Sequence, residues 1–206
     1  AYAAQRTFAS PEDAVAALAQ AVKANDRAAM LAVLGPEAEK SIRSPDRVAD
    51  RARADRFAAT YDEKHAIVRD GDSRASLTLG SDDFPFAFPL VKTGERWRFD
   101  TTAGVDELNA RRVGENELSV INVMLAIVDA QRDYASADRN RDGVREYARK
   151  FASAQGRHDG LYWPTKAGEP PSPLGSLMST ATAEGYKQKS GPTPYHGYYF
   201  RMLTGQ

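Results

Sequence analysis

The fold is decided by residues 65–101, which read HAIVRDGDSRASLTLGSDDFPFAFPLVKTGERWRFDT. Apolar and polar residues alternate here, and Asp70-Gly71 and Thr93-Gly94 supply turns between the alternating runs. This pattern predicts a four-stranded antiparallel sheet. The expected strands span 66–69, 73–79, 86–91 and 96–101. In the last run Trp97 and Phe99 share one face, which predicts a sheet with one face on a core and one in water.

Helix signals precede this stretch. Ser10 and Pro11 form a typical helix start, and the apolar residues that follow recur at helical spacing. Asp26 begins a second expected helix, which Gly35-Pro36 ends, and Ser44-Pro45 begins a third that reaches about Tyr61. This third helix carries interleaved charges, which indicate a solvated face rather than a basic patch. They are Arg47, Asp50, Arg51, Arg53, Asp55 and Arg56.

Helices followed by an antiparallel meander make residues 1–104 an α+β domain. The layout resembles that of NTF2-like (nuclear-transport-factor-2-like) and cystatin-like domains, in which a sheet wraps around a helix. The resemblance implies either a pocket between sheet and helix or a surface used only for packing. The residues expected at such a pocket are Trp97 and Phe99.

The second expected domain, residues 105–206, begins with a long central helix from Val105 to about Ala137, which Gly114 interrupts or leaves intact. Apolar residues cover much of its circumference, so we expect it to be buried on more than one side. The first apolar row is Leu118, Ile121, Leu125 and Val128. The second row is Val120, Met124, Ile127 and Tyr134.

The rest of the second domain is rich in Gly and Pro from 156 to 194, which predicts loops. We expect short helices at 146–154 and 177–184 and a strand at 197–203. A single strand cannot satisfy its own backbone groups, so it pairs with the first sheet or with chain that follows Gln206, and we favour the second. The resulting loop-rich α+β part weakly resembles the head of type IV pilins.

Composition excludes several classes of function. The 206 residues contain 28 Lys and Arg against 28 Asp and Glu, so no net field attracts nucleic acid. The absence of cysteine excludes disulfides, thiolate catalysis and Cys-ligated metals. The longest apolar stretch, 118–128, is too short for a transmembrane segment. The first residues, 1–5, are typical of a mature N-terminus from which a signal peptide has been removed, or of a trimmed chain.

One loop has the pattern of a calcium ligand set. Asp138, Asn140 and Asp142 place oxygen atoms on alternate residues, Gly143 allows the turn, and Glu146 follows as a further ligand. A full EF-hand is excluded because Arg149 stands where the bidentate Glu would be. The other interpretation is a turn in which these side chains cap backbone amides.

Two aromatic segments form a candidate ligand-binding groove. Tyr162 and Trp163 lie in one, and Tyr195 and His196 lie in the other. Large rigid rings with polar tips stack on a sugar ring or a peptide, and the same residues also form ordinary cores. The sequence leaves both interpretations open.

No catalytic residue is proposed. His65, His158 and His196 have no partner at a metal-binding spacing, and no nucleophile elbow, Walker A or dinucleotide motif is present. The sequence therefore favours a protein that is not an enzyme, although a catalytic triad forms in space rather than in sequence.

Several segments together resemble a known family. They are 8–15 (FASPEDAV), 110–118 (ARRVGENEL), 128–135 (VDAQRDYA), 159–164 (DGLYWP) and 194–204 (PYHGYYFRMLT). They are similar to the bacterial exported proteins grouped as domain of unknown function 2950. The resemblance implies a periplasmic or extracellular protein and brings no activity or catalytic residues with it.

Together these observations predict an exported envelope protein that is a non-enzymatic binding or assembly module, stabilised by Ca²⁺ at the Asp138 loop. Its expected partner is another envelope protein or a glycan. The alternative is a hydrolase or carbohydrate-binding protein that uses the aromatic groove.

Overall fold

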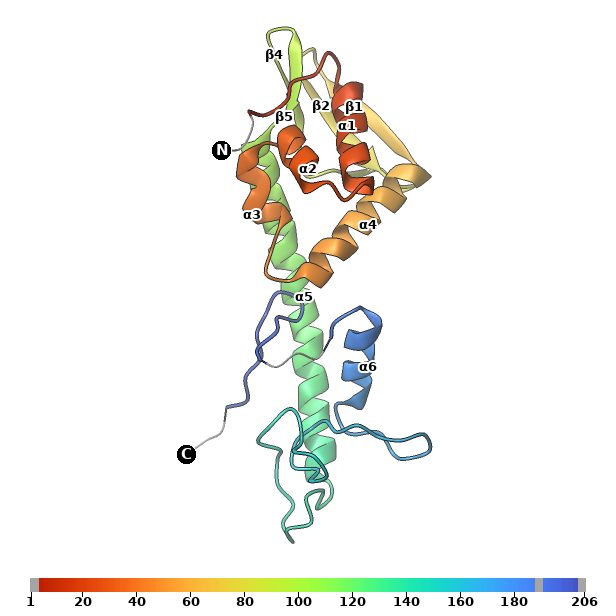
Figure 1. Ribbon diagram of the computed structural model, residues 1–206, viewed down its shortest axis with the longest axis vertical. Coiled ribbons are helices and arrows are strands. Elements are labelled where there is room, and N and C mark those ends of the chain that lie inside the picture. The colour runs from red at the N-terminus through yellow and green to blue at the C-terminus, as the bar shows by residue number, and fades with distance from the viewer. Residues whose placement is uncertain (1–3, 188–190, 204–206) are drawn as a thin grey trace. The chain divides into compact units, whose positions relative to one another are not determined.

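The computed structural model describes residues 4–187 and 191–203 (Figure 1). The chain forms two compact units, Ala1–Gly114 and Glu115–Gln206. The predicted long helix is confirmed as α5 (Thr101–Ala135), which starts in the first unit and continues into the second. Gly114 does not interrupt it.

Two of the predicted N-terminal helices begin and end at the expected caps. α1 (Pro11–Lys23) is capped by Ser10, whose Oγ accepts a hydrogen bond from Asp13 N at 3.0 Å. α2 (Arg27–Leu34) is capped by Asp26 and ends at Gly35, whose φ of 102° few other residues adopt. A 3₁₀ turn, η1 (Pro36–Ala38), and the short α3 (Glu39–Ile42) follow.

The third predicted helix is α4 (Arg47–Glu63), and its cap differs from the expectation. Asp46 rather than Ser44 is the N-cap, and its carboxylate accepts from Ala49 N at 3.0 Å. Ser44 instead accepts from Asp46 N and donates to Asp50 Oδ1. The helix therefore begins at Arg47, directly after the cap residue Asp46.

The sheet has five strands rather than four. They are β1 (His65–Asp70), β2 (Arg74–Leu79), β3 (Phe84–Pro85), β4 (Leu90–Thr93) and β5 (Arg96–Phe99). All pairs are antiparallel, in the order β1-β2-β4-β5, with β3 on β2. The predicted strand 86–91 is wrong because Pro85 and Pro89 cannot donate to a ladder. The segment between them turns Phe88 into the core.

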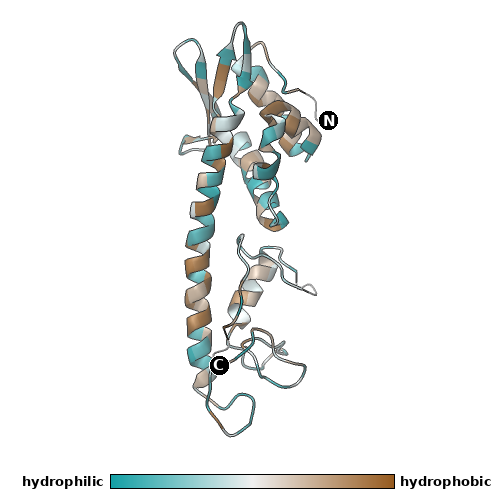
Figure 2. Ribbon diagram, turned by 90° about the vertical axis from the view of Figure 1, so that its left-hand side faces the viewer, coloured by the Kyte–Doolittle hydropathy of each residue, from teal (hydrophilic) through white to brown (hydrophobic). Residues whose placement is uncertain are grey.

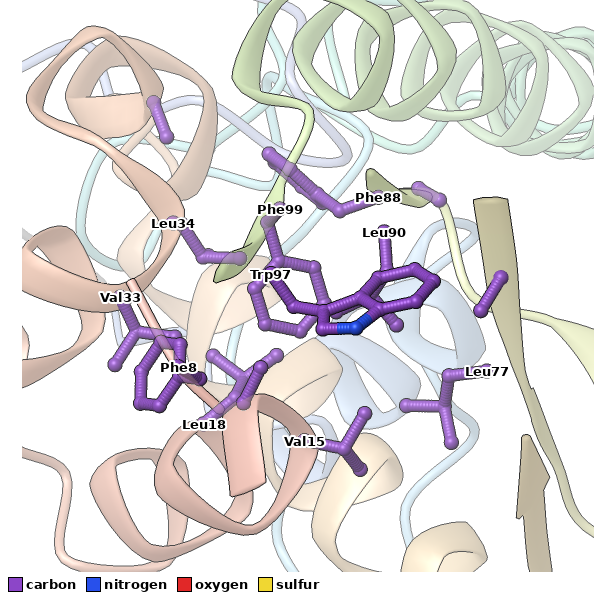
Figure 3. Packing of buried hydrophobic residues seen from close by; sticks show 14 of the residues in the cluster. Phe8, Val15, Leu18, Val33, Leu34, Leu77, Phe88, Leu90, Trp97 and Phe99 are labelled. Atoms are coloured by element: carbon purple, nitrogen blue, oxygen red, sulfur yellow. The ribbon is translucent and has the colours of Figure 1, made fainter. Parts of the chain in front are cut away.

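The core of the first unit lies between the sheet and the helices α1 and α2 (Figure 3). Trp97 and Phe99 are 4% and 0% exposed within it. The N-terminal segment closes one side, because Phe8 and Trp97 exchange backbone hydrogen bonds of 2.8 and 2.9 Å. The expected pocket at Trp97 and Phe99 is therefore wrong, since both residues are packed in the interior.

A close contact fixes α5 against this core. A Cβ built on Gly104 would overlap the ring of Phe88, which is 1% exposed. The helix start is held by Ala103 N, which donates to Asp100 Oδ1 at 3.2 Å, and by Thr101 Oγ1, which donates to Leu34 O at 2.7 Å. Only glycine lets the helix backbone come this near to the ring.

The second unit is mainly loops around the latter part of α5. The predicted helix near 177–184 is confirmed as α6 (Gly175–Ala183). The predicted helix at 146–154 is absent, because Ala148 N donates to Gln131 Oε1 and Ser153 N to Tyr162 O instead of forming helical bonds. The expected strand at 197–203 is also absent as far as residue 203, where the described chain ends. The backbones of Tyr195 and Tyr198 hydrogen-bond each other across a turn.

One side of α5 carries exposed apolar residues (Figure 2). Its first apolar row is 42–67% exposed in the described structure. Ala130 and Tyr134 are buried in the small core of the second unit, and Val123 is buried as well. The prediction that α5 is buried on more than one side is therefore wrong, because that core covers a single side of the helix.

No helix among the described residues is long and apolar enough to span a bilayer.

Two glycines of α5 provide a matched test of the Phe88 contact. Gly104→Ala should lower the free energy of unfolding by roughly 1–3 kcal/mol, because the new methyl group overpacks against Phe88. Gly114→Ala, with nothing within 4 Å of the new Cβ, should raise it by about 0.5–1 kcal/mol through helix propensity. Urea denaturation followed by circular dichroism measures both. Equal effects of the two substitutions would show that the Phe88 contact does not constrain the helix.

Candidate functional site

The second unit contains an aromatic pocket of about 380 Å³. Its lining includes Val123 and Ile127 of α5 and Leu177 and Met178 of α6. Aromatic residues from the loops complete it. They are Phe151, Tyr162, Tyr186, Tyr195 and Phe200. The volume lies in the range of small-ligand sites, and the lining is predominantly apolar.

Tyr162 is placed by the backbone on both sides of it. Leu161 is fully buried, and its carbonyl accepts a hydrogen bond from Leu174 N at 2.9 Å. Tyr162 N donates to Phe151 O at 2.8 Å. Gly160 contacts the backbone of Ala152 so closely that a Cβ would lie 2.7 Å from its carbonyl carbon. The Asp-Gly-Leu-Tyr-Trp-Pro segment therefore needs its glycine to bring Tyr162 to the pocket.

Tyr195 and His196 are held by Glu184, the C-cap residue of α6. The Tyr195 hydroxyl hydrogen-bonds the Glu184 carboxylate, and His196 Nε2 lies 3.5 Å from Glu184 Oε2. Burial, followed by the Glu184 charge, raises the pKa of Tyr195 to about 12. The ring of Tyr186 packs edge-on to Tyr195 at 4.8 Å. The bond to Glu184 therefore orients the neutral Tyr195 hydroxyl, whose oxygen can still accept a hydrogen bond.

Trp163 lies in a different environment from Tyr195. Its ring stacks on His158, with centroids 4.3 Å apart and planes 15° apart. It lines a second cavity of about 760 Å³, which also includes Tyr162. Of the predicted ligand-binding set, the structure brings Tyr162 and Tyr195 together in the aromatic pocket. Trp163 joins only Tyr162, and His196 lines neither cavity.

The predicted calcium loop is organised by hydrogen bonds to its own backbone. Asp138 accepts from Asp142 N at 3.1 Å and from Gly143 N at 2.9 Å. The Asn140 amide donates to Asp142 Oδ2 at 2.7 Å and to Glu146 Oε1 at 3.2 Å. Over residues 4–187 and 191–203, no three His, Cys, Asp or Glu side chains converge as a metal site. The loop thus has the hydrogen bonds of an Asx turn, and calcium binding stays a prediction.

Each histidine is engaged with an aromatic or acidic neighbour. His65 stacks on Tyr61 at 3.8 Å, His158 stacks on Trp163, and His196 faces Glu184. In the described part of the chain, no histidine hydrogen-bonds a serine or threonine hydroxyl. The histidines here complete aromatic clusters, and no pair of nucleophile and base is formed by them.

Sequence reasoning missed Glu184 and Tyr186, which position Tyr195. The sequence contained one signal, because Gly185 follows Glu184 and glycine is common just beyond a helix end. In the structure Gly185 adopts a φ of 99°, as such residues commonly do. That signal marks the turn that carries Tyr186 back toward the pocket. It does not show which aromatic ring the turn will meet.

The fold and the cavities define an α+β protein with a concave aromatic surface in its loop-rich unit. The chain belongs to the family described as a protein of unknown function (DUF2950), whose model matches residues 5–206. The predicted resemblance is thereby confirmed over nearly the full length. No curated protein and no solved structure matches the chain.

Tyr195 should make stability depend on pH in the alkaline range. Its pKa is about 12 in the folded chain against an ordinary 10.0, so the stabilisation is complete below about pH 10 and is lost as pH rises toward 12. Tyr195→Phe lacks this group. The difference in unfolding free energy between the native chain and the variant should therefore be constant from pH 7 to 9 and fall above pH 10. A difference that stays constant to pH 12 would show an unperturbed phenol.

Proposed function

We propose that this protein is a non-enzymatic binding module, and that its aromatic pocket receives an aromatic side chain of a partner protein. The single observation that carries the proposal is the pocket itself. Rings of Phe151, Tyr162, Tyr186 and Tyr195 line it together with aliphatic side chains of two helices. Edge-to-face contacts with such rings add to the free energy of apolar burial.

Polar groups at the same pocket support a peptide ligand. The neutral Tyr195 hydroxyl and the side chains of Thr182 and Thr193 are among its lining residues. A few oriented polar groups around an apolar interior can pair with backbone amides on either side of an inserted ring. Binding by insertion requires no general acid or base. This agrees with the finding that each histidine contacts an aromatic or acidic neighbour.

A glycan is the second candidate, and the Trp163 cavity favours it. This cavity combines an aromatic face with Asp129, Asp133 and Ser172. The Oγ atom of Ser172 is buried and has no hydrogen-bond partner among the described residues. A ring stacked on Trp163 with hydroxyls near these groups would supply a partner. A hydrolase is less well supported, because each of the two carboxylates lies beside an arginine, Asp129 beside Arg132 and Asp133 beside Arg139.

The setting of this function is also part of the proposal. The family resemblance supports export to the periplasm or the cell exterior. The order of helices and sheet in the first unit supports an NTF2-like layout. The pilin-head likeness has less support, because residues 197–203 form no strand in the described chain.

Separate substitutions distinguish the two ligand classes because Tyr195 and Trp163 line different cavities. Peptides selected from a random display library should be enriched in aromatic residues. Their affinity should fall by roughly 2 kcal/mol, or about thirtyfold, in Tyr195→Ala and remain unchanged in Trp163→Ala. Tyr195→Phe, which keeps the ring but not the hydroxyl, should lose less affinity than Tyr195→Ala, and the circular dichroism spectrum of each variant is the folding control. Loss of glycan-array binding in Trp163→Ala alone would assign the glycan role instead.

Calcium should stabilise the second unit if the Asp138 loop binds it. A thermal melt in millimolar Ca²⁺ should then show a higher Tm than in EDTA, by an amount that corresponds to about 2.7 kcal/mol at 100 times the Kd. Asp142→Ala should remove the shift. Asp83→Ala, which removes an exposed carboxylate of the first unit, should retain it. Identical melts in EDTA and Ca²⁺ would show that the loop is only a capped turn.

A further inference from the structure

The first unit contains a cavity of about 410 Å³ that the proposed function does not use. Helices α1, α2, α3, α4 and α5 contribute to its walls, together with the segment between β3 and β4. Its interior side is apolar and includes Leu18, Phe57, Phe86, Phe88 and Leu108. All of these elements belong to the same compact unit, apart from the end of α5 beyond Gly114.

The apolar side is a set of packed aromatic rings. The rings of Phe57 and Phe86 lie 5.2 Å apart, and those of Phe86 and Phe88 lie 5.6 Å apart. Leu18 and Phe88 are each 1% exposed, so this side is continuous with the core of the unit. An aliphatic chain placed here would be removed from water over most of its length, which is favourable for each methylene group.

The other lining residues are strongly basic. Six arginines and one aspartate, Asp50, line the cavity. The arginines are Arg27, Arg43, Arg47, Arg51, Arg53 and Arg112. Charges of one sign around an apolar concavity focus the electrostatic field within it and attract an ion of opposite sign. The chain as a whole carries no net charge, so this is a local feature.

Half of these arginines have carboxylate partners. Arg51 pairs with Asp55 at 3.0 Å, Arg53 with Asp50 at 3.4 Å, and Arg27 with Glu39. Arg112 has only neutral acceptors, Asn109 Oδ1 at 3.0 Å and Ser41 O at 3.4 Å.

Arg43 and Arg47 differ from the other arginines. Among the residues described, neither guanidinium has a hydrogen bond or ion pair. Arg27 provides independent evidence of an anion site, because its Nε is buried and has no acceptor. A buried donor without an acceptor is costly, and an anionic oxygen in the cavity would supply one.

We propose that this cavity binds an amphipathic organic anion with a single apolar chain. The chain lies on the rings of Phe57, Phe86 and Phe88, and the carboxylate or phosphate head meets Arg43 and Arg47. A guanidinium group presents a planar fork of donors that pairs with either head group in bidentate geometry. An amphipathic cation would be repelled by the same arginines, and a neutral alcohol would leave their charge uncompensated.

Calorimetric titration of the purified chain tests the head group. The probes are dodecanoate and dodecyl phosphate, each below its micelle concentration, and dodecanol below its solubility limit. At least one of the two anions should bind ten or more times tighter than dodecanol, and its affinity should fall as salt rises. Comparing the two anions identifies the head group as carboxylate or phosphate. Equal affinity for dodecanol and both anions would overturn the proposal.

Paired substitutions test the location. Arg43→Gln with Arg47→Gln, both at exposed positions, should weaken anion binding tenfold or more. The matched double variant Arg145→Gln with Arg157→Gln removes the same charge from exposed positions of the second unit and should bind as the native chain does. Unchanged binding in the first pair, or equal loss in the second, contradicts the assignment.

A further substitution tests the chain site. Ala54 lines the cavity on α4, and Ala54→Phe would fill it without changing charge. Binding of the anion should be lost while the circular dichroism spectrum is retained. Tyr195→Ala should leave it intact, which separates this site from the aromatic pocket of the second unit. Loss of binding in Tyr195→Ala with retention in Ala54→Phe would overturn the proposal.

Discussion

The contact between Phe88 and Gly104 is the constraint on which the first unit depends. The strand β5 passes directly into α5 through Asp100, whose N–H donates to Pro89 O at 2.8 Å. Strand, connection and helix start are therefore fixed together. The ring of Phe88 closes the core below the helix and also forms part of the arginine-lined cavity. A side chain at position 104 would move α5, and with it Leu108 and Arg112 on the wall of that cavity.

Local chemistry explains which elements the sequence could predict. Caps such as Ser10 and Asp26 act within a single turn of chain, so the helices that they begin are visible in the sequence. The prolines that interrupt the predicted strand 86–91 are visible in the sequence, but the packing of Phe88 between β3 and β4 depends on Gly104, which belongs to a distant helix. The exposed row on α5 was also misjudged, because hydropathy shows that a face is apolar but not whether other chain covers it.

The candidate sites show the same difference between features that local sequence reveals and features that only the fold creates. Tyr162 and Tyr195 were identified because they lie in two aromatic segments of the second domain. Their separation from Trp163 could not be predicted, since it depends on the fold of a loop-rich region. The arginine cavity was missed because its lining comes from several helices and from the segment between β3 and β4, which only the fold brings together. Interleaved charges on α4 suggest mutual neutralisation, yet Arg47 has no carboxylate partner among the described residues.

The pairing of Phe8 with Trp97 also affects how the chain reaches its folded state. The segment that closes the core is synthesised before its partner strand. Phe8 and Trp97 lie 89 positions apart in the sequence, as do Thr7 and Arg96, which also form a hydrogen bond. At about 5–20 residues per second, synthesis separates the two by roughly 4–18 s. Contacts of such long sequence separation are intrinsically slow to form. The first unit therefore cannot complete its folding while its early helices emerge, and the nascent chain stays open over this interval.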